Sequence, residues 1–85
     1  KLVFSNAQLE VYGIHELHVL EDVLRQSTDE IKENVANRIA KKIGHTPQIG
    51  ETALSFLEAY YGGLRQRLEQ RMLFGDRKED KYDKK

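Results

Sequence analysis

The sequence contains no cysteine and no tryptophan, and Pro47 is its only proline. Without cysteine, the chain can form no disulfide, no thiolate metal site and no cysteine nucleophile. Fourteen basic residues balance fourteen acidic ones, so no net charge attracts the chain to nucleic acid, anionic lipid or acidic substrates. No apolar run approaches the ~18–20 residues that span a bilayer, and no segment has the pattern of a signal peptide. We therefore expect a cytoplasmic protein with no membrane partner.

The length of 85 residues suits one domain with a thin hydrophobic core. Residues 1–74 are expected to form this single helical domain, and a core so thin makes self-association a natural expectation. Residues 75–85 are mostly charged and contain no aliphatic side chain, which predicts a solvated, flexible tail. Because the chain begins with Lys1 rather than methionine, we also expect a fragment or a processed chain.

Three segments have the apolar spacing of amphipathic helices. The first covers residues 14–26. Ser27 precedes Glu30 by three residues, which is the spacing of a capping box and predicts the start of a second helix. Gly44 is the expected end of that helix. The third helix is predicted over residues 51–72, so the fold class is mainly α, a small three-helix domain.

The N-terminal residues 1–13 permit two readings. "LVF" and "LEVY" are rich in strand formers, and "SNAQ" between them would make a turn, which favours a short β-hairpin or strand. In the alternative, Ser5 caps a helix that includes Leu9 and Tyr12. We expect the extended form, covered by helices because an isolated hairpin is only marginally stable.

Gly62 and Gly63 lie in the middle of the third predicted helix, where each glycine costs about 1 kcal/mol relative to alanine. The helix breaks there, a ligand contacts it, or another helix approaches closely beneath Phe56 and Tyr60. The apolar periodicity continues through the pair, so we expect a continuous helix with close packing. The approaching helix would belong to the same chain or to a second copy, and alanine at either glycine would then lower stability.

Few residues suggest catalysis or metal binding. His15 and His18 are one helical turn apart, but they lack the His-Glu-x-x-His order and an obvious third ligand, and His45 is the only other histidine. No serine or threonine has the flanking residues of a nucleophile elbow. We therefore expect no enzyme, no metal site and no cofactor.

Residues 37–58, "NRIAKKIGHTPQIGETALSFLE", have Ala40 inside one helix, Gly44 at a turn, and a second helix after it. This pattern resembles the helix-turn-helix of bacterial and phage repressors. The resemblance implies that Gln48, Glu51, Thr52 and Ser55 face the major groove, and that Arg38, Lys41 and Lys42 contact phosphates. The sequence departs from that family at Gly50, where an aliphatic residue is usual, and at Glu51, which brings negative charge toward DNA. A small DNA-binding transcriptional regulator is therefore our alternative.

Aromatic and arginine side chains gather on the third predicted helix, and these residue types are common anchors of protein interfaces. The arginines give residues 60–72 an excess of positive charge, whereas residues 1–26 have an acidic excess. In the competing interpretation, Tyr61 belongs to the core and the arginines pair with nearby glutamates. We predict a non-enzymatic protein–protein interaction module that self-associates through this helix. The predicted partner-binding residues are Phe56, Tyr60, Tyr61, Gly62, Gly63, Arg65, Arg67 and Arg71.

Overall fold

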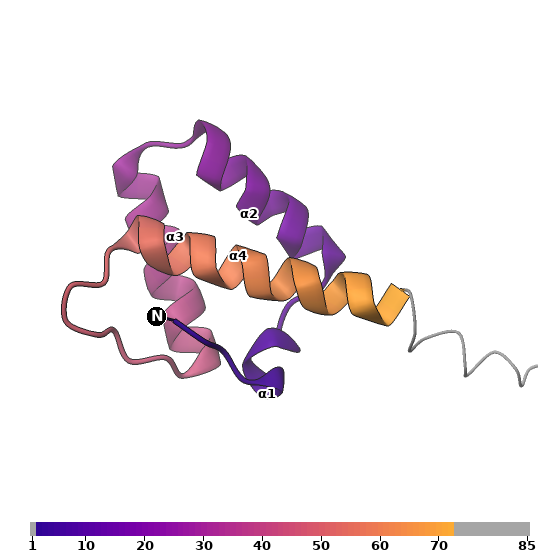
Figure 1. The fold of residues 1–85 in the computed structure, drawn as a ribbon. Helices are drawn as coiled ribbons and strands as arrows, with labels where there is room; N and C mark the ends of the chain where they lie inside the picture. The colour runs from indigo at the N-terminus through magenta and orange to yellow at the C-terminus, as the bar shows by residue number, and fades with distance from the viewer. Residues whose placement is uncertain (1, 73–85) are drawn as a thin grey trace, which may run out of the picture.

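The computed structural model of the chain describes residues 2–72, so the predicted tail at 75–85 lies outside the described residues. Four helices occur in this part: α1 (Asn6–Leu9), α2 (Ile14–Gln26), α3 (Asp29–Ile43) and α4 (Ala53–Gln70). In Figure 1, α2 and α3 are joined by a short connection, and α4 runs across both of them. The long helix α4 packs against each of the other three helices. The expected mainly helical fold is confirmed.

The predicted N-terminal hairpin or strand is not found, since none of residues 2–72 lies in a strand. Instead, the Ser5 hydroxyl accepts a hydrogen bond from the Gln8 amide at 3.2 Å, and the Gln8 side chain accepts one from the Ser5 amide at 2.9 Å. This reciprocal capping box starts one helical turn, α1, in place of the expected turn between strands. Ser5 therefore caps a helix, as in the alternative, but the helix ends at Leu9 before it reaches Tyr12.

Most of the observed ends of α2 and α3 agree with the ends predicted from local sequence signals. The α2 helix has the predicted bounds, and Gly44 ends α3 in a left-handed conformation with φ of 75°. The predicted cap of α3 is wrong by one residue, because Thr28 accepts the hydrogen bond from the Ile31 amide at 3.2 Å. The Ser27 hydroxyl instead donates to the Val23 carbonyl at 2.7 Å and closes the end of α2.

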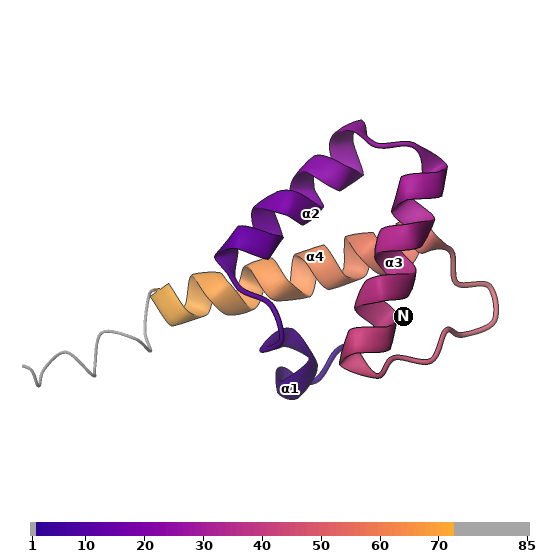
Figure 2. The ribbon, with the colours of Figure 1, turned by 180° about the vertical axis from the view of Figure 1, so that it is seen from behind.

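The start of α4 also differs from the prediction. Thr52 and Ser55 form a reciprocal capping box, and the helix begins at Ala53 rather than at Glu51. It then continues without interruption through Gly62 and Gly63, which confirms the predicted continuity. Figure 2 shows the loop between α3 and α4 swinging out to the side of α3 before it returns to the start of α4.

One face of α4 forms the centre of the hydrophobic core. Its side chains Phe56, Leu57, Tyr60 and Leu64 are each at most 2% exposed. The other helices cover this face with six further buried residues: Leu9, Leu17, Leu20, Ala36, Ile39 and Ile43. The Tyr60 hydroxyl donates to the Gln8 carbonyl at 2.7 Å, so its polar atom is satisfied although the ring is buried. Burial, with a smaller effect from Tyr12, raises the pKa of Tyr60 to about 12.

Candidate partner-binding site

A cavity with a volume of about 920 Å³ lies along the outer face of α4. Its floor includes Ala59, Gly62 and Gly63, and its rim includes Val3 from the N-terminal segment and Ile49 from the loop before α4. We call this cavity the Gly62 groove. It opens on the side of α4 that faces away from the core.

Two β-branched side chains stand out on the rim of the Gly62 groove. Val3 is 84% exposed and Ile49 is fully exposed. Leu54 and Met72, which do not line the groove, are also exposed. Single exposed apolar side chains are normal on protein surfaces, but here two of them border the same concave surface.

The two glycines on the floor differ in their surroundings. A Cβ atom at Gly63 would lie 3.4 Å from Cδ2 of Leu9, which is contact distance. An alanine would thus fit at position 63 in ordinary van der Waals contact with Leu9 of the short α1, so the described residues show no approach at Gly63 that requires a glycine. A Cβ atom at Gly62 would meet nothing within 4 Å from any described part of the chain. Packing within the described residues therefore gives no reason for a glycine at position 62.

The predicted partner-binding residues fall into different environments. Phe56 and Tyr60 belong to the core of this chain, so their rings are not available at its surface. Tyr61 is half-buried and packs against the core, which is close to the competing interpretation that Tyr61 is a core residue. Among the aromatic and glycine positions of the prediction, only Gly62 is openly exposed.

Arg65 lies on the surface and Arg67 is partly buried, and each of them has an acidic partner. The Arg67 Nη2 atom lies 2.6 Å from Glu10 Oε2, and Nη1 lies 3.3 Å from Asn6 Oδ1, so Arg67 ties α4 to the N-terminal segment. This pair matches the expected attraction between the acidic N-terminal part and the basic end of α4. Arg65 pairs with Glu69 one turn later at 3.1 Å, and both side chains are exposed. Arg71 is also exposed.

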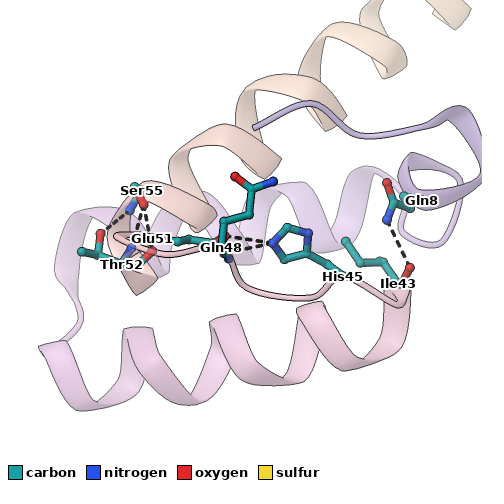
Figure 3. A network of polar contacts seen from close by, with 7 residues as sticks. All are labelled: Gln8, Ile43, His45, Gln48, Glu51, Thr52 and Ser55. Carbon is teal, nitrogen blue, oxygen red and sulfur yellow. Dashed lines mark hydrogen bonds and ion pairs between the residues drawn. The ribbon is translucent and has the colours of Figure 1, made fainter. Parts of the chain in front are cut away.

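The loop that carries Ile49 is held by a polar pair that the sequence patterns did not reveal (Figure 3). His45 Nε2 lies 3.0 Å and 3.1 Å from the two carboxylate oxygens of Glu51, and the two side chains are only 11% and 7% exposed. The Gln48 amide donates to the same carboxylate at 2.9 Å. The His45 ring also stacks on Phe56, with ring centroids 5.0 Å apart. These contacts position the loop at one end of the Gly62 groove.

The ionisation of Glu51 reflects these contacts. Burial opposes the charged form, but the hydrogen bonds from the Gln48 amide and the His45 ring outweigh it. As a result, the pKa of Glu51 lies below its ordinary value. The carboxylate is therefore a fixed acceptor that closes the loop.

The side chains expected to read DNA are mostly occupied. Glu51 is paired with His45, while Thr52 and Ser55 cap the start of α4. Gln48 is exposed, as are the three predicted phosphate contacts on α3, which are Arg38, Lys41 and Lys42. Because a capping hydroxyl has its hydrogen bonds inside the chain, this arrangement does not favour base reading by Thr52 and Ser55.

His15 and His18 are exposed on α2. Within residues 2–72, no group of three or more histidine or acidic side chains is placed to hold a metal ion. Among the same residues, no helix is long and apolar enough to cross a membrane.

Comparison with known proteins gives no relative for this chain. No family model matches the sequence, and no curated protein or solved structure matches it. The fold and the Gly62 groove are therefore not linked to a known activity by similarity.

Proposed function

We propose that the chain is a non-enzymatic protein–protein interaction module that binds a helix of its partner in the Gly62 groove. The main support is the open position of Gly62 in the middle of an 18-residue helix. An exposed glycine there costs about 1 kcal/mol relative to alanine. Since no described residue fills the space above it, a close approach by a partner would account for the glycine.

The composition of the groove suits a helical ligand. Val3 and Ile49 provide apolar contacts at the rim, and an amphipathic helix recognises such a groove through apolar side chains spaced by three and four residues. Gln48, Gln66 and Gln70 also line the groove, and their amides can donate and accept hydrogen bonds around the apolar contacts.

A small helix-turn-helix DNA-binding regulator stays the alternative. It is supported by Arg38, Lys41 and Lys42, which are exposed on α3 and form no ion pair with another described residue. The capping roles of Thr52 and Ser55, together with the balanced net charge, make it the weaker proposal.

Selection of helical peptides tests the proposal. A displayed library of amphipathic peptides about 18 residues long, the length of helix that would cover α4 at ~1.5 Å per residue, is selected on the immobilised chain. Peptides that bind are then measured on Gly62→Leu, which fills the groove, and on Asn34→Leu, which adds the same side chain to the exposed face of α3.

The expected result is that Gly62→Leu abolishes peptide binding whereas Asn34→Leu retains it, with the helical circular dichroism of both variants unchanged. Equal binding to the wild-type chain and to Gly62→Leu would refute the proposed site.

A further inference from the structure

We propose that the helix bound in the Gly62 groove is α4 of a second copy, which lies antiparallel and crosses the first copy at Gly62. This inference rests on the proposed function and specifies its partner. The inference is supported by two charged residues of α4, Glu58 before Gly62 and Arg65 after it. Their opposite charges are matched between copies when the two helices are antiparallel.

The complementarity follows from helix geometry. Glu58 lies four residues before Gly62 and Arg65 lies three residues after it, so at about 100° per residue both project from the same side of Gly62. Along the axis they lie about 6 Å before it and about 4.5 Å after it. A two-fold axis between antiparallel helices reverses the position of each residue along the helix axis but leaves the residue on the same side of Gly62. Glu58 of each copy is therefore brought next to the partner's Arg65.

Neither Glu58 nor Arg65 has a contact within its own chain that would prevent this ionic contact between copies. Glu58 is exposed and forms no ion pair or side-chain hydrogen bond with another described residue. Arg65 contacts Glu69 at 3.1 Å in an exposed pair on its own helix, and such pairs contribute little because water screens them. An arginine has five donors, so Arg65 can bind Glu58 across the interface while it keeps Glu69.

The residues on the opposite side of Gly62 also fit the antiparallel arrangement. Ala59 lies three residues before Gly62 and Gln66 four residues after it, again on one side, so Ala59 of each copy meets the partner's Gln66. The small side chain leaves room for the long one. In the centre, Gly62 meets the partner's Gly62, where the absence of both side chains permits close approach of the backbones.

A parallel pair would not use these charges. It places each Glu58 level with the partner's Glu58 and each Arg65 level with the partner's Arg65, so no opposite charges are matched. The antiparallel pair forms the ionic contact twice and closes as an isologous dimer, in which both copies use the same surface.

Charge reversal tests the orientation by sedimentation equilibrium of the full chain over a wide concentration range. The wild type is expected to dimerise reversibly. Glu58→Arg and Arg65→Glu are each expected to weaken the dimer about tenfold or more, because each places like charges together at both symmetric contacts. Glu33→Arg on α3 is the control, since it makes the same change of charge at an exposed position away from the groove.

Restoration of the dimer is the decisive observation. An equimolar mixture of Glu58→Arg and Arg65→Glu, and the chain that carries both substitutions, should each regain dimerisation, because opposite charges face each other again. Circular dichroism at the lowest concentration confirms that loss of the Arg65–Glu69 pair leaves Arg65→Glu folded.

Two results would overturn the inference: a wild-type chain that stays monomeric at every concentration, or a dimer whose charge-reversal variants are not rescued in the mixture. The peptide selection separates this failure from failure of the proposed function. Peptides that bind the wild type but not Gly62→Leu would retain the groove as a binding site for a different helix.

Discussion

Alanine at position 62 is expected to stabilise the isolated chain and to weaken its association. Replacement of glycine by alanine inside a helix contributes about 1 kcal/mol to the free energy of unfolding. The new Cβ atom meets no neighbour within 4 Å, so no clash reduces this gain. For a domain of this size, the gain corresponds to a rise in melting temperature of roughly 4–8 °C.

Gly63→Ala is the matched control one residue away. Its Cβ atom would lie 3.4 Å and 3.7 Å from the two methyl groups of Leu9, at contact distance and without overlap. The same propensity gain of about 1 kcal/mol is therefore expected, together with a small dispersion gain. Both substitutions should raise the melting temperature, which reverses the expectation from the sequence that alanine at these sites lowers stability.

Association distinguishes the two variants. A methyl group at position 62 separates two helices whose backbones cross closely there, at a cost of typically 1–3 kcal/mol, whereas position 63 is covered by Leu9. Thermal melts are recorded at the lowest workable concentration, and association is measured by sedimentation equilibrium. A lower melting temperature for Gly62→Ala would show that its surroundings are not open. Equal association of Gly62→Ala and the wild type would refute the reasoning that assigns the partner to this glycine.

Three further predictions concern the core, the loop and the alternative function. Tyr60→Phe removes the hydroxyl that donates to the Gln8 carbonyl, so urea denaturation should show a loss of about 1 kcal/mol in the free energy of unfolding; no loss would mean that water replaces this bond. The lowered pKa of Glu51 means that its ionised form stabilises the fold above the ordinary carboxyl pKa, and this contribution disappears as the pH falls through the lowered value. Melts from pH 7 to pH 3 should therefore show a difference between the wild type and Glu51→Gln that shrinks with falling pH, and a constant difference would contradict this role. Fluorescence anisotropy should detect no binding to duplex DNA at ~50 mM salt; binding that Lys41→Ala with Lys42→Ala weakens would favour the DNA-binding alternative.

Much of the helical framework follows from short-range signals. The bounds of α2 and the end of α3 at Gly44 agree with the apolar periodicity and the glycine cap. The continuity of α4 through its glycines also agrees with its periodicity. These features depend on residues three or four positions apart, and that is the range over which a helix makes its own contacts.

The N-terminal segment shows how tertiary contacts change a local preference. Its strand-forming residues predict an extended pair, but Phe4 packs edge-on against Tyr60 and Phe56, with ring centroids 5.1 Å and 5.7 Å apart. Leu9 joins the same core, and the capping box at Ser5 makes the helical turn that brings it there. Burial against α4 therefore outweighs strand propensity, which is a weak and context-dependent preference.

Which residues of α4 are exposed at the proposed binding surface depends even more strongly on tertiary structure than the form of the N-terminal segment does. Periodicity identifies the faces of α4, but it does not determine which face the rest of the chain covers. Phe56 and Tyr60 were predicted to contact a partner and are buried, whereas Gly62 is open and the neighbouring Gly63 is covered by Leu9 of α1. The pair of His45 and Glu51 has no periodic signal, since a loop brings the two side chains together. The sequence by itself determined where α2, α3 and α4 form to within about two residues, through contacts within each segment. Only the tertiary structure decided which side chains meet and which surface is left for a partner, because exposure depends on how distant segments pack.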